Sequence, residues 1–135
     1  MQFKGLKKIR VAVLEIDEAA KKFAGLFGME MLSPPAPAND PTMRFANFGQ
    51  GGGSSAVELV SPAGTDSALG RFLARRGEGV YNVQVAVDDI DEFLRVCGER
   101  GIALLGKPGP PPRRACWVKP VHTGSVLFEV IEERN

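Results

Sequence analysis

The sequence is poor in the residues that most metal sites and acid–base sites use. It contains one histidine, His122, and two cysteines, Cys97 and Cys116, among 135 residues. Two thiols cannot by themselves form a four-thiolate zinc site or a disulfide framework. Histidine is the commonest metal ligand and a frequent general base, so a single copy restricts both chemistries severely. We expect His122 in a surface turn, beside Thr123 and Gly124, and Cys97 in the core.

Charge of one sign and long apolar runs are scarce as well. The 17 Lys and Arg residues nearly balance the 16 Asp and Glu residues, which leaves a net charge of +1. Nucleic-acid-binding domains usually carry a basic stripe, so we expect no nucleic-acid partner. No apolar run reaches the roughly 18 residues of a membrane-spanning helix, so we expect no membrane partner. Because the first residues do not form a signal-peptide pattern either, we expect a cytoplasmic protein.

The sequence does contain an internal repeat. Residues 10–18 read RVAVLEIDE, and residues 84–92 read QVAVDDIDE. Each copy begins with the apolar pattern of a half-buried strand and continues with the periodicity of a helix. Gly28 and Gly101 follow these two predicted helices, at positions where a glycine commonly ends a helix. The sequence therefore predicts two similar modules, each starting with a strand and a helix.

The two modules also end alike, with SAVELV at residues 55–60 and VLFEVI at residues 126–131. A proline-rich segment precedes the third strand of each module, at residues 33–41 and 106–114. Proline cannot donate a hydrogen bond to a sheet, so we expect these segments to be connections or sheet edges. We predict an α+β fold of two βαβββ modules, with residues 1–60 as the first module, 61–79 as a linker and 80–135 as the second module.

Two shorter segments complete the predicted architecture. Residues 67–76 of the linker form a helix, with Asp66 as its N-cap and Gly77 at its end. Residues 49–53 read GQGGG. A phosphate-binding loop would lead from a strand into a helix and would carry a lysine. This segment instead joins two predicted strands, which favours a hairpin turn.

Strand alternation places polar side chains at matching positions of the two modules. Lys8 and Arg10 share one face of the first strand with Ala12, and the opposite face is wholly apolar. Asn82 and Gln84 take the equivalent positions in the repeat. Polar residues at both equivalents indicate a polar face in each module.

Glu58 and Glu129 are equivalent in the repeat, and each stands alone between apolar neighbours. Burying an unpaired carboxylate is costly, so each must be paired, hydrogen-bonded, metal-bound or exposed. Two interpretations stay open. Either both side chains point outward from half-exposed strands, or the two sheets curl around a cleft. The residues that would line this cleft are Lys8, Arg10, Glu58, Asn82, Gln84 and Glu129.

Further polar and aromatic residues have two possible placements each. Arg44 either lines the cleft together with Ala46 and Phe48 or lies outside it, and Trp117 either lines the cleft or packs beneath it. The arginines in or beside loops are either solvated or in contact with the phosphate groups of an anionic ligand, and they are Arg75, Arg76, Arg113 and Arg114.

Three stretches of the chain resemble a known superfamily. Residues 66–79 (DSALGRFLARRGEG) lead into residues 80–90 (VYNVQVAVDDI), and residues 120–130 (PVHTGSVLFEV) end the second module. They resemble the vicinal-oxygen-chelate superfamily of glyoxalases, bleomycin-resistance proteins and dioxygenases, and within it the methylmalonyl-CoA epimerases. This resemblance implies a glyoxalase-like fold with a curled cleft, a homodimer, and a small carbonyl or acyl-CoA-like ligand.

The resemblance also implies a set of site residues. Family members hold a metal ion with one residue from each of four strands, commonly two histidines and two glutamates or glutamines. The histidine positions fall on Lys8 and Asn82, and the other two fall on Glu58 and Glu129. An ammonium group has no lone pair to offer a metal, so at most a weakly held divalent cation at Glu58 and Glu129 fits. We expect no cofactor, and we hypothesise a metal-free ion cluster of Lys8, Glu58 and Glu129.

The epimerases place one further glutamate just before their second strand, as one of two proton-transfer groups. Residues 37–41 read PANDP here, so this glutamate is absent and Asp40 is the nearby carboxylate. The other proton-transfer group corresponds to Glu129. A single-base reaction is therefore easier to support than a two-base epimerisation.

Three functions stay open. The first is an enzyme of isomerase or lyase type, with Glu129, Lys8 and Glu58 as catalytic residues and Arg10, Arg44, Asn82, Gln84 and Trp117 as ligand contacts. It would transfer a proton next to a carbonyl, with Glu129 as acid or base and Lys8 or Arg10 stabilising the enolate oxygen. The second is a non-catalytic protein that binds or sequesters a small molecule, like the bleomycin-resistance proteins. The third is a structural subunit with a vestigial pocket.

Overall fold

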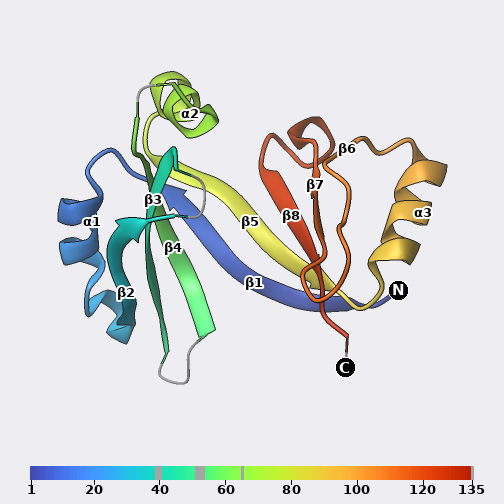
Figure 1. Cartoon of the computed structure of the whole chain (residues 1–135), viewed down its shortest axis with the longest axis horizontal. Coiled ribbons are helices and arrows are strands. Elements are labelled where there is room, and N and C mark those ends of the chain that lie inside the picture. Colours follow the sequence, from blue (N-terminus) through green and yellow to red (C-terminus); the bar gives the residue numbers. More distant parts are fainter. Residues whose placement is uncertain (39–40, 51–53, 65, 135) are drawn as a thin grey trace. The chain divides into compact units, whose positions relative to one another are not determined.

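A computed structural model describes residues 1–38, 41–50, 54–64 and 66–134 (Figure 1). Its helices and strands follow the chain in the order β1 (Phe3–Ala12), α1 (Ile16–Phe23), β2 (Glu30–Pro37), β3 (Met43–Gln50), β4 (Ser54–Pro62), α2 (Ala68–Arg76), β5 (Gly79–Val87), α3 (Ile90–Arg100), β6 (Leu104–Leu105), β7 (Ala115–Val118) and β8 (Leu127–Glu132). Short 3-10 turns lie at Leu26–Gly28 and Pro120–His122. The predicted α+β class and the order βαβββ of both modules are confirmed.

The chain forms two compact units, which are described separately. The central unit is Lys8–Tyr81, and the terminal unit joins Met1–Lys7 to the second half of the chain from Asn82 onward. The central unit thus includes α2, and the terminal unit includes the first residues of β1. The division of the sequence repeat into 1–60, 61–79 and 80–135 stays a prediction.

In the central unit, four strands lie in the order β2-β3-β4-β1, and β1 runs parallel to β4. Helix α1 covers one face of this sheet (Figure 1), where Ile16 and Ala20 pack against Phe48 and Leu59. The spacing of four residues puts Ile16 and Ala20 on one side of the helix. Acidic residues in the first turn and lysines in the last turn suit the helix dipole.

Helix α2 packs on the opposite face of the central sheet. Leu69 and Leu73 contact Ala12 and Val60, which alternate with the residues beneath α1. The N-cap is Ser67, whose hydroxyl oxygen accepts the Gly70 N–H at 3.0 Å. The prediction of Asp66 as the N-cap was therefore wrong, because the side chain that reaches the first turn belongs to the next residue, Ser67. Gly77 ends the helix as predicted, with a φ of 74°.

One detail of the central unit corrects the sequence prediction, and a second agrees with it. Helix α1 ends at Phe23, and Gly25 takes the left-handed conformation there with a φ of 76°, so Gly28 does not end it. The first proline-rich segment continues β2 as far as Pro37, at the edge of the described sheet, where missing N–H donors cost least. Asp40 and residues 51–53 of the predicted hairpin turn lie outside the described residues.

In the terminal unit, the strands lie in the order β5-β8-β7-β6, and β5 runs parallel to β8. Helix α3 covers one face of these strands (Figure 1), and its Ile90 packs with Cys116 and Val130. Asp89 caps this helix by accepting the Glu92 N–H at 3.0 Å, and Gly101 ends it as predicted, with a φ of 67°. None of the helices in the described ranges is long and apolar enough to span a membrane.

Candidate functional site

A row of polar residues crosses all four strands of the central sheet. The strand register pairs Arg10 with Glu58, Glu58 with Asn47, and Asn47 with Ser33. Residues that are directly paired on neighbouring strands point to the same face of a sheet. Ala12 lies two residues beyond Arg10 and packs under α2, so the polar row belongs to the face that α2 covers in part. Helix α1 lies on the other face.

The carboxylate of Glu58 lies between two cationic side chains. The Nε of Arg10 donates a hydrogen bond to Oε1 at 2.8 Å, and the Nζ of Lys8 lies 3.7 Å from Oε2. The side chains of Arg10, Lys8 and Glu58 are 13%, 20% and 14% exposed. The structure thus brings these three predicted residues together and supplies the partner that a half-buried carboxylate needs.

Sequence reasoning missed the other end of this row. The hydroxyl of Ser55 donates to Oδ1 of Asn47 at 2.7 Å, and the side-chain amide of Asn47 donates to the hydroxyl of Ser33 at 3.3 Å. Asn47 stands between Ala46 and Phe48, which is the same pattern of a polar residue between apolar neighbours that singled out Glu58. The same pattern could therefore have identified Asn47 from the sequence.

The strands of the terminal unit carry the equivalent row. The register pairs Gln84 with Glu129, Glu129 with Trp117, and Trp117 with Leu105. The side-chain amide of Gln84 donates a hydrogen bond to Oε1 of Glu129. Glu129 is 7% exposed and Gln84 is 8% exposed. A carboxylate and an amide are therefore buried together on the face of the sheet that is opposite to α3.

Asn82 and Trp117 belong to this same face. Asn82 is 6% exposed and precedes Gln84 by two residues on β5, so both side chains point to one side. Trp117 is half-buried, and its ring lies against the backbone of Gly106. Cys116, the neighbour of Trp117 on β7, packs under α3. Trp117 therefore points to the opposite face of the sheet, the face that carries Glu129.

Comparison with known proteins places this architecture in a family. The model of the glyoxalase/bleomycin resistance protein/dioxygenase superfamily matches residues 7–117. The chain belongs to this superfamily. It is 28% identical to the mitochondrial methylmalonyl-CoA epimerase of Bos taurus, over 93% of this chain and 72% of that protein.

Solved structures of epimerases agree with this superfamily member in fold. The crystal structure of the Mycobacterium tuberculosis methylmalonyl-CoA epimerase is 25% identical and superposes with a TM-score of 0.79, covering 98% of this chain and 90% of that one. A variant of the Streptomyces coelicolor methylmalonyl-CoA epimerase, in complex with 2-nitronate-propionyl-CoA, is 24% identical with a TM-score of 0.79, covering 98% of this chain and 96% of that one. The predicted superfamily, its glyoxalase-like fold and its resemblance to the epimerases are confirmed.

The placement of Arg44 is a correction. It does share a face with Ala46 and Phe48, but those two residues form the core beneath α1 and lie on the face opposite to Glu58. Arg44 donates to both carboxylate oxygens of Asp17 on α1, at 3.2 and 3.3 Å. These hydrogen bonds lower the pKa of Asp17 below its usual range. Apolar neighbours two residues away indicated the buried face, and not a ligand-binding face.

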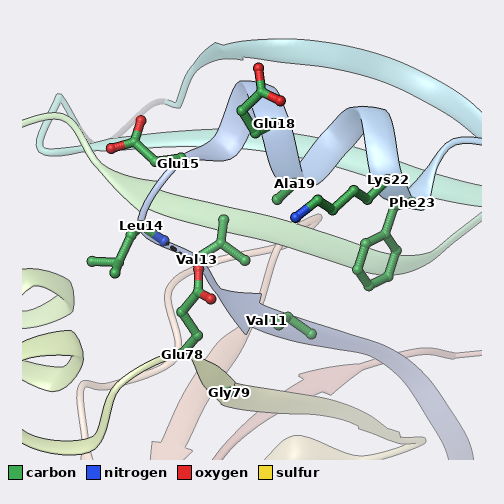
Figure 2. Close-up of a pocket in the computed structure, with 10 residues that line it drawn as sticks. All are labelled: Val11, Val13, Leu14, Glu15, Glu18, Ala19, Lys22, Phe23, Glu78 and Gly79. Atoms are coloured by element: carbon green, nitrogen blue, oxygen red, sulfur yellow. Dashed lines mark hydrogen bonds between the residues drawn. The ribbon is translucent and has the colours of Figure 1, made fainter.

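A pocket of about 620 Å³ lies on the α1 side of the central unit, away from the Glu58 row (Figure 2). Val11, Val13 and Phe23 supply its apolar part. Glu78 lies on its rim, where its carboxylate accepts the Leu14 N–H at 2.8 Å. No predicted site residue of this superfamily member lines this pocket.

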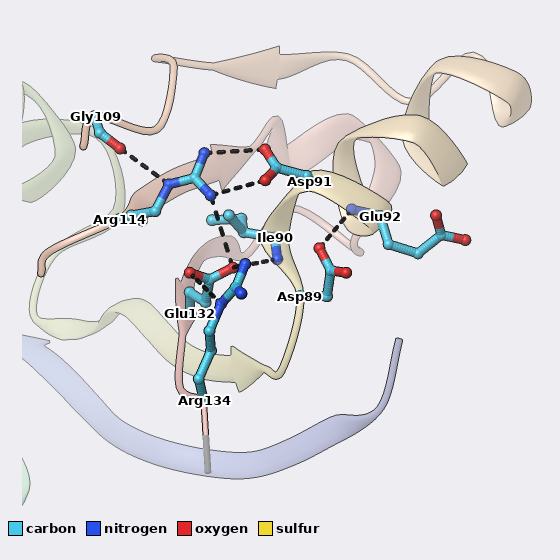
Figure 3. A network of polar contacts seen from close by, with 8 residues as sticks. All are labelled: Asp89, Ile90, Asp91, Glu92, Gly109, Arg114, Glu132 and Arg134. Atoms are coloured by element: carbon cyan, nitrogen blue, oxygen red, sulfur yellow. Dashed lines mark hydrogen bonds and ion pairs between the residues drawn. The ribbon is translucent and has the colours of Figure 1, made fainter. Parts of the chain in front are cut away.

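The loop arginine Arg114 is held by a network of polar contacts. It donates to both carboxylate oxygens of Asp91 at 3.0 Å and to the carbonyl of Gly109 at 3.0 Å (Figure 3). The hydrogen bonds from Arg114 lower the pKa of Asp91. Glu132 lies 3.7 Å from the same guanidinium group and accepts the Ile90 N–H at 2.9 Å. This network fixes the second proline-rich segment to the start of α3.

The histidine and the cysteines do not contribute to the polar rows. The exposed His122 accepts the Ala103 N–H through Nε2 at 3.0 Å. Cys97 is buried in the core as predicted, and Cys116 is fully buried, which raises the pKa of its thiol to about 11. Among the residues that the structure describes, no group of three or more His, Cys, Asp and Glu side chains is arranged to hold a metal ion.

Proposed function

We propose that this protein transfers a proton next to the carbonyl of a small acyl-CoA-like ligand, with Glu129 as the acid or base and without a metal ion. The observation that carries the proposal is the buried pair of Gln84 and Glu129. An amide donor fixes the carboxylate in place and brings no charge of its own. The resemblance to methylmalonyl-CoA epimerases supports a ligand of the acyl-CoA class. The nitronate complex of the Streptomyces coelicolor relative supports the same class.

We assign to Lys8 or Arg10 the role of stabilising the negative charge that develops on the carbonyl oxygen of the ligand. When Glu129 removes a proton from the carbon next to a thioester, the electron pair moves to that oxygen and forms an enolate. A fixed cation stabilises such an oxygen, and the family positions carried over from the resemblance assign this role to Lys8 or Arg10. Glu58 holds both cations in place through the contacts of 2.8 and 3.7 Å. Return of the proton from Glu129 completes a single-base cycle.

A metal ion does not fit the residues that occupy the family's metal positions. Lys8 offers no lone pair, and its ammonium group lies 3.7 Å from the carboxylate of Glu58, where it would repel a dication. The same carboxylate already accepts a hydrogen bond from Arg10. No step of the proposed reaction therefore passes through a metal. Metal independence, homodimer formation and a cytoplasmic location stay predictions.

Deuterium exchange tests the proposed reaction. Methylmalonyl-CoA is incubated with the protein in D2O, and incorporation at the carbon next to the thioester is followed by mass spectrometry. We expect exchange with the wild-type protein, loss of exchange with Glu129→Gln, and normal exchange with Glu133→Gln. The last variant is the matched control, because Glu133 is an exposed partner of Lys7 close to Glu129 in the chain.

The same samples separate the enzyme from the sequestering alternative. A ligand-induced rise in melting temperature without any exchange would support sequestration and overturn the proposed reaction. Exchange that persists in Glu129→Gln would overturn the role of Glu129.

A further inference from the structure

The row that contains Glu129 changes character along its length. Gln84 and Glu129 form its polar end, and Trp117 and Leu105 form its apolar end. In the central unit, the equivalent row is polar throughout, because Asn47 and Ser33 follow Glu58. The two rows therefore differ in polarity on the strands that follow the shared carboxylates. An apolar surface begins one strand away from Glu129.

Gly106 determines where the ring of Trp117 can lie. A methyl group at Gly106 would lie 3.3 Å from Cζ3 and 3.4 Å from Cε3 of Trp117, which is a tight approach to a rigid ring. Gly106 also has a φ of 74°, a left-handed conformation that disfavours other residues. The glycine thus allows the six-membered part of the indole to pack directly on the backbone after β6.

The loop that carries Gly106 is held at nearby Gly109. Arg114 donates to the carbonyl of Gly109 at 3.0 Å and is itself fixed by Asp91 through two hydrogen bonds (Figure 3). The backbone under the indole is therefore supported from both sides, by β6 and by this arginine. A supported surface holds an aromatic ring in one orientation better than a free loop would.

We propose that Gly106 is a positioning residue of the Glu129 site, acting through Trp117, and that Trp117 and Leu105 receive an apolar acyl group of the ligand. This inference rests on the proposed function, since it takes Glu129 as the group that meets the reacting carbon. Leu105 is 44% exposed and Trp117 is half-buried, so both retain surface for a ligand to cover. The class of ligand is an acyl thioester with a branched or aromatic acyl chain.

Intrinsic fluorescence tests the position of the ring, because Trp117 is the only tryptophan. Gly106→Ala is expected to shift the emission maximum of the ligand-free protein. Two matched controls should leave it unchanged. Gly109→Ala adds a methyl group in the same loop where nothing lies within 4 Å, and Gly124→Ala adds one at a φ of 65° with the same free space. The second control separates backbone strain from contact with the ring.

Titration with phenylacetyl-CoA and methylmalonyl-CoA, followed by the same fluorescence, tests the ligand class. We expect the wild type to bind phenylacetyl-CoA more tightly, and Gly106→Ala to lose about tenfold in that affinity, as a misfitted apolar group does in a hydrophobic site. Isothermal titration calorimetry measures the affinity of every variant, including those that lack Trp117. KM for exchange of phenylacetyl-CoA should rise while kcat changes little. The double variant Gly106→Ala with Trp117→Phe should recover affinity, because phenylalanine lacks the ring atoms that the new methyl group meets.

The outcomes are distinct from those of the proposed reaction. Unchanged emission and unchanged phenylacetyl-CoA affinity in Gly106→Ala would overturn the positioning role, even where Glu129-dependent exchange is intact. If the double variant does not recover affinity for phenylacetyl-CoA, the positioning role is overturned as well. This comparison decides the matter even when the single variant Gly106→Ala folds poorly. Tight, Gly106-dependent binding without exchange would support the subsite and contradict only the proton transfer.

Discussion

The side-chain amide of Gln84 donates a hydrogen bond to the carboxylate of Glu129, and the two residues are 8% and 7% exposed. At the equivalent position of the repeat, Arg10 donates to Glu58. An amide of its own unit thus contacts Glu129, and a guanidinium of its own unit contacts Glu58. We assign proton transfer to Glu129 because it matches a proton-transfer position of the epimerases, and we assign charge support to Glu58 because it contacts Lys8 and Arg10.

Replacing Glu58 should destabilise the protein. Glu58→Gln removes the negative charge between Lys8 and Arg10, and the side chain of Arg10 is only 13% exposed. We expect a loss of about 1–3 kcal/mol in the free energy of unfolding, measured by chemical denaturation. The control is Glu18→Gln, which breaks an exposed pair with Lys21 and should cost at most about 0.5 kcal/mol. Equal effects of both substitutions would contradict the supporting role of Glu58.

The network around Arg114 should make stability depend on acid pH. The hydrogen bonds from Arg114 keep the pKa of Asp91 below its unfolded value, so the folded state binds fewer protons than the unfolded state in that range. The resulting stability is present above the unfolded pKa of about 4 and is lost as pH falls through the folded pKa. Arg114→Gln should flatten this acid limb, whereas substitution of the exposed neighbour Arg113 by glutamine should not. Denaturation curves between neutral and acid pH measure both.

The N-cap of α2 gives a local test of the fold. Ser67→Ala removes the hydroxyl that accepts the Gly70 N–H and should cost about 1 kcal/mol of stability. Asp66→Ala removes only an exposed ion pair with Arg71 and should stay within about 0.5 kcal/mol of wild type. A larger loss at Asp66 than at Ser67 would show that the helix is capped differently.

The two cysteines should be inert in the folded protein. Burial raises the pKa of the Cys116 thiol to about 11 and also raises the pKa of Cys97, so little thiolate is present at neutral pH. Titration with a chromogenic disulfide reagent at pH 8 should label neither residue until denaturant is added. Rapid labelling of native protein would show that the core beneath α3 opens readily.

Part of this organisation follows from the sequence alone. The repeat predicts two modules, and a polar residue between apolar neighbours identifies Glu58 and Glu129. The alternation of side chains along a strand predicts which residues share a face of the sheet, but it does not predict which face a helix covers. Arg44 was therefore assigned to the wrong face of the sheet. The pairing of Gln84 with Glu129 depends on the register of two strands that are far apart in the chain, which no local pattern determines. Ser67 and Asp66 are both good N-caps, so only the backbone geometry selects between them.

The most direct test of the central claim compares proton exchange with and without a metal ion. Protein dialysed against a chelator is assayed for deuterium incorporation into methylmalonyl-CoA, before and after titration with cobalt, nickel or zinc, while bound metal is measured in the same samples. We predict exchange in the chelated protein, no increase on titration, and no stoichiometric tight binding. Exchange that is absent in the chelated protein and is restored by one bound metal ion per chain would contradict the account.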